Sequence, residues 1–194
     1  VFIQNAVDEV QETALIGVLL AVVVLFLFLH RFGTTLIISI AIPISIIATF
    51  TLMYFYGLTI NIMTLGGLAL GAGMLVDNAI VVLENIFRNH ESGADAKTAA
   101  INGTAEVGGA ITASTLTTII VFLPVIYLQD AAGELFKDQA WTVAFSLLSS
   151  LFVAIFVIPM LYHRFYRKRT APAQARSLQL KSYGRFLLGL LRFR

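Results

Sequence analysis

The sequence predicts an all-α integral membrane protein: a partial helical bundle of about five transmembrane helices, followed by an amphipathic helix on the cytoplasmic side. Two features of the composition predict this class. Of the 194 residues, 58% are hydrophobic and only 12% are charged, whereas soluble domains carry about 25% charged residues. The third feature is the distribution of charge, since residues 32–76 contain no charged side chain and Asp77 follows within the same apolar stretch.

Uncharged windows locate the helices, because a helix needs about 20 apolar residues to cross the hydrocarbon core. The first window is bounded by Glu12 and by Arg31. The uncharged run that follows is too long for one crossing, and the hydrophilic break at residues 56–61 divides it into two helices. A fourth helix follows Glu106, and a fifth ends at a basic cluster. The expected spans form residues 13–162 and cover residues 13–29, 34–55, 62–86, 107–128 and 139–162.

The distribution of Lys and Arg predicts the orientation of the chain. With the N-terminus outside, twelve of the thirteen Lys and Arg residues lie on the inner side and Lys137 lies outside, as expected from the excess of positive charge in cytoplasmic segments. Residues 1–12 are then an outer lead-in, and residues 163–175 are a basic cytoplasmic linker. Residues 176–194 mix apolar with basic side chains, which predicts an interfacial helix on the anionic inner leaflet. The alternative is the start of a sixth span.

Between Arg88 and Glu106 the sequence predicts a loop and a short surface helix before the fourth span. Pro43, Pro124 and Pro159 lie inside or near the ends of three spans. Neighbouring groups in a membrane bundle can satisfy the carbonyl groups that a proline frees. We therefore expect these prolines to kink their helices.

The composition excludes several kinds of site. The chain has no cysteine, which excludes disulfides and thiolate metal ligands, and its three histidines have no metal-binding spacing. No compact basic face with interleaved aromatic residues predicts nucleic-acid binding. We therefore expect membrane lipids as partners, and no nucleic acid, cofactor, metal or catalytic residue. The first residue is Val and no signal peptide is visible, so we expect a fragment of a longer chain.

Asp77 is the candidate functional residue, because a carboxylate at bilayer depth is costly unless it is paired, protonated or facing water. Ala69 and Gly73 precede it at four-residue spacing, and Gly67 and Gly71 form a second small pair. Small residues let another helix approach closely, which places Asp77 against protein rather than lipid. Desolvation there favours the protonated form and a nearby cation favours the ionised form, so the carboxyl can load and release protons. The alternative is a purely structural ion pair.

Two further features lie close to Asp77 in the predicted bundle. Glu84 follows seven residues later, near the inner boundary and on nearly the same helix face. It is either a proton exit group or a solvated helix end beside Asn85 and Arg88. The fourth span carries hydroxyl groups that either line a water path beside Asp77 or bond back to carbonyl groups four residues earlier. This cluster comprises Thr112, Ser114, Thr115, Thr117 and Thr118.

A longer motif contains Asp77, since residues 71–85 read GAGMLVDNAIVVLEN. This motif resembles the fourth transmembrane helix of the resistance-nodulation-division (RND) efflux pumps. Nearly all of residues 1–169 fit the second to sixth helices of that fold, and the tail resembles the amphipathic helix that follows on the cytoplasmic side. The other segments that carry the resemblance are residues 28–32, 41–44 and 57–61, with Pro124 and Pro159.

In such pumps the aspartate of this helix takes up protons and alternates between a salt bridge to a lysine of a later helix and a protonated state. Asp77 matches that position, so the resemblance implies that it is the proton relay. Where many drug exporters have a second acidic residue, this chain has Asn78, which cannot titrate but can form hydrogen bonds that orient Asp77. We expect Asn78, Glu84 and Asn85 to support the relay, and Ala69 and Gly73 to pack around it.

The resemblance also implies a transport class. It indicates a secondary active transporter rather than an enzyme: a proton antiporter of the type that exports hydrophobic and amphiphilic compounds and confers multidrug resistance. The implied location is the bacterial inner (plasma) membrane, with several crossings. The implied assembly is a homotrimer with a periplasmic adaptor and an outer-membrane channel. The porter regions, the second half of the bundle and the expected lysine lie outside these 194 residues.

Three alternatives stay open from the sequence. A relative with the same fold that moves lipids or metal ions, aids protein export or senses sterols would share the bundle. An intramembrane aspartyl protease needs two carboxyl groups that share a proton, and no second Asp lies in a predicted span. The third alternative is an inert structural bundle.

Overall fold

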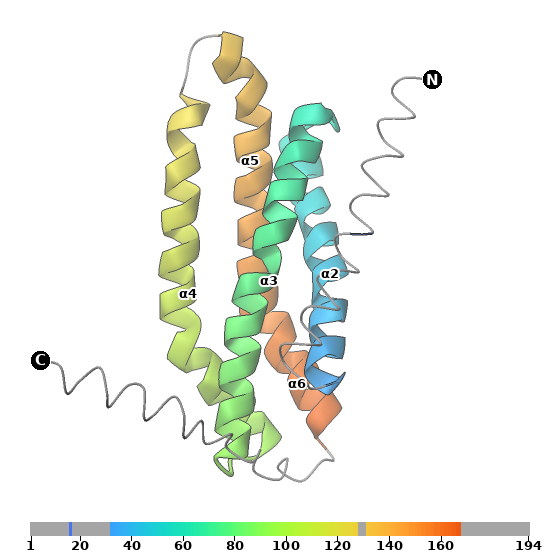
Figure 1. The fold of residues 1–194 in the computed structure, drawn as a ribbon, viewed down its shortest axis with the longest axis vertical. Coiled ribbons are helices and arrows are strands. Elements are labelled where there is room, and N and C mark those ends of the chain that lie inside the picture. The colour runs from blue at the N-terminus through green and yellow to red at the C-terminus, as the bar shows by residue number, and fades with distance from the viewer. Residues whose placement is uncertain (1–15, 17–31, 128–130, 168–194) are drawn as a thin grey trace, which may run out of the picture.

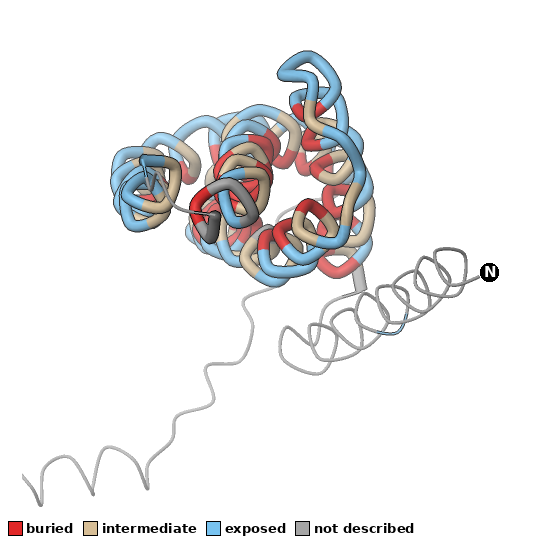
Figure 2. The backbone as a smooth tube through the Cα atoms, turned by 90° about the horizontal axis from the view of Figure 1, so that it is seen from above, coloured by how far each residue is buried: buried red, intermediate tan, exposed pale blue. Residues whose placement is uncertain are grey.

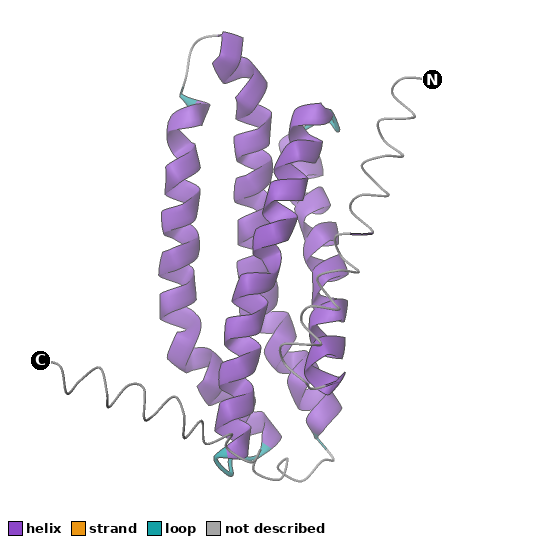
Figure 3. Ribbon diagram, viewed as in Figure 1, coloured by secondary structure: helices purple, strands orange, loops and turns teal. Residues whose placement is uncertain are grey.

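The computed structural model describes Ile16, residues 32–127 and residues 131–167, and these residues form helices without a strand (Figure 3). Four of the helices are long and apolar enough to cross a membrane, which confirms the all-α membrane class. The expected span at residues 13–29 and the expected amphipathic helix at residues 176–194 lie outside the described residues. The helices are α2 (Phe32–Tyr56), α3 (Ile62–Glu91), α4 (Ala96–Ile126), α5 (Ala131–Phe152), a π-helical turn η1 (Val153–Val157) and α6 (Ile158–Tyr166).

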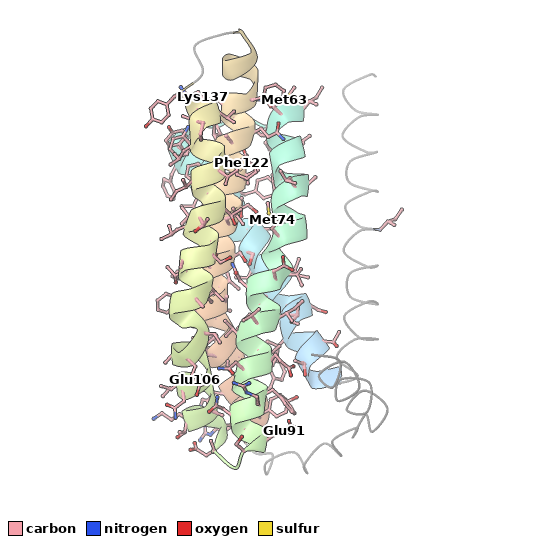
Figure 4. All side chains as sticks on the ribbon, turned by 60° about the vertical axis from the view of Figure 1, so that its left-hand side comes forward. Met63, Met74, Glu91, Glu106, Phe122 and Lys137 are labelled. Carbon is pink, nitrogen blue, oxygen red and sulfur yellow. The ribbon has the colours of Figure 1, made fainter. Side chains whose placement is uncertain are left out.

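The helices stand side by side in one elongated bundle, with α3 between α4 and α2 (Figure 1). Buried segments face the interior of the bundle and exposed segments face outward (Figure 2). Lys137 and Met63 lie at one end, and Glu91 and Glu106 lie at the other (Figure 4). The segments that the charge distribution predicts as outer and inner are therefore at opposite ends of the bundle.

Polar caps fix where α3 and α4 begin. The side chain of Asn61 accepts the amide hydrogen of Thr64 and the hydroxyl of Thr64 accepts that of Asn61, a reciprocal capping box that satisfies two donors at the helix start. Asp95 accepts the amide hydrogens of Lys97 and Thr98 at 3.2 and 3.4 Å. Hydrogen bonds from the side chain and backbone of Thr98 hold the pKa of the Asp95 carboxyl below its ordinary value.

The helix boundaries differ from the expected spans between α3 and α4. The loop is short, because α3 continues to Glu91 and α4 begins directly after Asp95. The expected short surface helix is the first part of one unbroken helix that runs from Ala96 to Ile126. The helix is continuous because the cap at Asp95 starts it and no proline interrupts it before Pro124.

A π-helical turn separates α5 from α6. It covers Val153–Val157 and lies just before Pro159, which occupies the first turn of α6. Proline has no N–H to give to the carbonyl group four residues earlier, that of Ile155, and its ring clashes with that group in a regular helix. The wider turn removes this clash. Pro43 and Pro124, in contrast, lie within α2 and α4, each of which is one continuous helix.

Two glycines bring α3 close to α5. A Cβ atom added at Gly67 would lie 2.8 Å from the carbonyl oxygen of Gln139 and 2.9 Å from Cβ of Thr142. A Cβ atom added at Gly71 would meet Oγ and Cβ of Ser146, the latter at 2.6 Å. Real Cβ atoms do not approach other atoms so closely, so any side chain at these two positions would push the helices apart.

We expect Gly71→Ala to lower the free energy of unfolding of the bundle. Overpacking in a close contact costs about 1–3 kcal/mol, and this exceeds the roughly 1 kcal/mol that alanine gains over glycine in a helix. The matched control is Gly66→Ala in the same helix, because nothing lies within 4 Å of a Cβ atom built at Gly66. Helical circular dichroism during detergent-induced unfolding measures both variants. Equal stability of the two variants would show that α3 and α5 are not in close contact.

Candidate functional site

Asp77 lies on an exposed face of α3. Its side chain forms no hydrogen bond or ion pair with any residue in the described ranges 32–127 and 131–167. Gly73 and Ala69, one and two helical turns before it, are exposed too. The small side chains therefore leave open space beside the carboxylate within the described bundle. The helix that we expect to pack over Ala69 and Gly73 stays a prediction.

The face of α3 that lies about 100° around the helix from Asp77 is packed, and it holds Asn78. With about 100° per residue, Gly67, Gly71 and Asn78 lie on one face of the helix. The side-chain amide of Asn78 donates to Thr115 Oγ1 on α4 at 3.2 Å and to Ser150 Oγ on α5 at 3.4 Å. Asn78 is therefore at the point where α3, α4 and α5 meet, while the neighbouring residue Asp77 points away from it.

The hydroxyl groups of α4 divide into two kinds. The hydroxyls of Thr112, Thr117 and Thr118 donate to carbonyl groups four residues earlier, at 2.7, 2.8 and 3.0 Å. For these three threonines the structure supports the second sequence interpretation, bonding within their own helix. Thr115 is different, because its buried hydroxyl faces Asn78 on α3.

Glu84 and Asn85 occupy different environments although they are neighbours. Glu84 is exposed, on the same side of α3 as Asp77. Asn85 is buried, and its amide donates to the carbonyl oxygen of Gly103 and to Oε2 of Glu106, both at 2.7 Å. Asn85 thus joins α3 to α4 near the end of the bundle that the charge distribution predicts to be inner, hereafter the inner end.

Charged and polar groups complete this inner cluster. Arg88 donates to Oδ1 of Asn85 at 2.8 Å, and its guanidinium lies 3.9 Å from Glu106. Asn89 donates to the same carboxylate at 3.2 Å. Beside this cluster, Gly103 packs on the backbone of Ile86. A Cβ atom added at Gly103 would lie 2.6 Å from the Cα atom of Ile86. The inner ends of α3 and α4 are therefore held by close packing and by hydrogen bonds.

Some polar contacts could not be found from the sequence. His90 is buried, and its Nδ1 atom lies 2.7 Å from the hydroxyl of Tyr162 on α6. The partners of Asn78 lie 37 and 72 residues away, and no local spacing signals such pairs. Among the described residues, no three His, Asp or Glu side chains come together as a metal site.

Two faces of α3 differ in their contacts. The face with Asn78 and Asn85 is fastened to α4 and α5 by hydrogen bonds. The face with Asp77 presents a carboxylate on an apolar helix with no partner among the described residues. Such a carboxylate can exchange a proton or accept a cation brought by another helix.

A family profile and individual known proteins indicate the same family for this chain. The profile described as "AcrB/AcrD/AcrF family" matches residues 1–190. Proteins named "Multidrug resistance protein MdtC" are similar over 188 residues, which is 97% of this chain: that of Yersinia enterocolitica is 35% identical, that of Citrobacter koseri 37% and that of Escherichia coli O139:H28 36%. The chain spans 18% of the length of these relatives.

We expect Asn85→Ala to destabilise the bundle by about 1–3 kcal/mol, because it removes hydrogen bonds to a buried carbonyl group and to a carboxylate. These acceptors are the carbonyl oxygen of Gly103 and Oε2 of Glu106. Asn89→Ala is the matched control, because Asn89 is less buried and its hydrogen bonds are longer. Detergent-induced unfolding followed by circular dichroism compares the two. A loss as small for Asn85→Ala as for Asn89→Ala would remove Asn85 from the contacts that hold α3 on α4.

Proposed function

The chain belongs to the AcrB/AcrD/AcrF family of RND efflux transporters, and we propose that it forms the proton-translocating membrane part of a proton-driven pump. The proposed cargo is a hydrophobic or amphiphilic compound, in keeping with the name of the relatives, multidrug resistance protein MdtC. The observation that carries the proposal is the position of Asp77: a carboxylate on the open face of a membrane-length helix whose other face is packed.

The proposed cycle uses the two charge states of Asp77. The ionised carboxylate attracts a cation, which the family resemblance implies to be a lysine of a later helix. Protonation from the outer side neutralises Asp77 and removes this attraction, so the helices can repack. Release to the inner side restores the ion pair. Each charge that crosses contributes about 2.3 kcal/mol per 100 mV of membrane potential, which drives the cycle in one direction.

The other predicted residues have supporting roles in this proposal. Ala69 and Gly73 leave room for the helix that carries the cation, because small residues let two helices approach closely. Glu84 lies on the same exposed side of α3, two turns closer to the inner end, where it can receive the proton from Asp77 through a chain of water molecules. Asn85 fastens the inner end of α3 to α4, so the relay moves as part of a defined helix pair.

The assembly and location follow from the same proposal. We place the chain in the bacterial inner membrane as a multi-pass segment surrounded by lipid, and as part of a homotrimer. A periplasmic adaptor and an outer-membrane channel would complete the export path. The aromatic cluster of Tyr56, Trp141 and Phe145, with ring centroids 4.8–5.5 Å apart, lies near the end predicted to be outer. Aromatic side chains of this kind gather at membrane interfaces.

We expect Asp77→Asn, made in the full-length protein that carries this segment, to reduce gradient-driven export to the level of cells without the pump. The amide has the shape of the carboxyl but cannot exchange a proton. Asp138→Asn is the control, because Asp138 lies beside Asn61 near the end predicted to be outer, whereas Asp77 is near the middle of α3. Drug accumulation and the amount of protein in the membrane are measured together. Undiminished export by Asp77→Asn at normal expression would refute the proton relay.

A further inference from the structure

Asn78 joins three helices through one side-chain amide. Each of its two N–H groups is directed to a different hydroxyl, Thr115 Oγ1 on α4 at 3.2 Å and Ser150 Oγ on α5 at 3.4 Å. The two hydroxyl residues are only 3% and 2% exposed. In an apolar interior a polar group is costly unless it is hydrogen-bonded, so α3 is favoured in the one rotation about its axis that keeps both contacts.

The packing of α3 on α5 at Gly67 and Gly71 does not by itself fix the rotation of α3, so the hydrogen bonds of Asn78 are needed for that. Gly67 and Gly71 let α3 lie close to α5, but they present no side chain that could interlock with it. A contact without side chains therefore fixes the distance between α3 and α5 more strongly than it fixes the rotation of each helix about its own axis. The amide of Asn78, on the same face and two to three turns closer to the inner end, supplies the directional contact.

Rotation of α3 determines where Asp77 points. Successive residues are separated by about 100° around the helix axis, so Asp77 turns whenever Asn78 turns. A side chain lies about 5 Å from the axis, and a rotation of about 20° therefore moves its end by about 2 Å. A displacement of about 1 Å is enough to change a reaction rate by about 100-fold when the reacting groups need a defined geometry.

We propose that Thr115 and Ser150 are positioning residues for Asp77: their hydroxyls hold the amide of Asn78 and thereby fix the rotation of α3 that presents the carboxylate to its partner. This inference rests on the proposed relay function of Asp77. Neither residue touches Asp77, and both act through Asn78. Their role follows from hydrogen bonds between helices that are far apart in the sequence.

The chain supplies matched controls for both residues. Thr117 is on the same helix as Thr115, but its hydroxyl bonds to the carbonyl oxygen of Ala113 within α4. Ser149 precedes Ser150 and is equally buried, but its hydroxyl has no hydrogen-bond partner among the residues that the structure describes. Removing these two hydroxyls removes the same atoms without touching Asn78.

The test uses the full-length protein in proteoliposomes and the hydrophobic reagent dicyclohexylcarbodiimide, which modifies protonated carboxyl groups in apolar surroundings. The rate of modification of Asp77 is followed by peptide mass spectrometry. We expect Thr115→Val and Ser150→Ala each to raise this rate about threefold to fivefold, the factor that one hydrogen bond of this kind represents. The rise is expected because a rotated Asp77 leaves its cationic partner and is protonated more often. Thr117→Val and Ser149→Ala should react at the parental rate.

Rescue separates positioning from a general loss of structure. Thr115→Ser keeps the hydroxyl and should return the rate to the parental value, whereas a merely structural role of the threonine methyl group would leave it raised. Parental rates in both Thr115→Val and Ser150→Ala would overturn the inference and leave the proton relay standing. Full gradient-driven export by Asp77→Asn would instead overturn the relay itself, so the two failures are distinguishable.

Discussion

The contact of α3 with α5 at Gly67 and Gly71 determines which side of α3 is packed and which side is left open. Because these positions carry no side chain, the backbone of α3 lies against Gln139, Thr142 and Ser146. Asn78 continues the same face and binds hydroxyls on α4 and α5. Asp77, about 100° further around the helix, is thereby placed on the open side. A membrane helix with this arrangement can hold a costly carboxylate ready for a partner while it remains fastened to its own bundle.

The polar groups of the bundle are arranged by depth. Asn61 bonds to Asp138 near the predicted outer end, Asn78 bonds to two hydroxyls in the middle, and Asn85 bonds to Glu106 and to Gly103 near the inner end. All three contacts leave α3, and none of them involves Asp77. This separation matters for a relay, because a carboxylate that changes its charge should not also carry the contacts that hold the helix. In the proposed relay, protonation of Asp77 alters its attraction to another helix while these bonds persist.

The sequence predicted the features that depend on composition and on local spacing. The charge of Asp77 in an apolar run, the small pair Gly67 and Gly71, and the all-α membrane class were all accessible in this way. The partners of Asn78 were not, since Thr115 and Ser150 are brought to it only by the packing of three helices. The sequence separated a short surface helix from the fourth span, whereas the cap at Asp95 begins one continuous helix that includes both. Hydropathy alone does not detect an amphiphilic first turn of this kind.

The central claim is that Asp77 changes its protonation state during transport, and infrared difference spectroscopy of the full-length protein measures this change directly. When the outer side of oriented proteoliposomes is acidified, we predict a carbonyl band of a newly protonated carboxyl group that is present in the parent protein and absent from Asp77→Asn. An identical difference spectrum in the two proteins would mean that Asp77 does not exchange its proton. The open face of α3 would then serve only for helix packing.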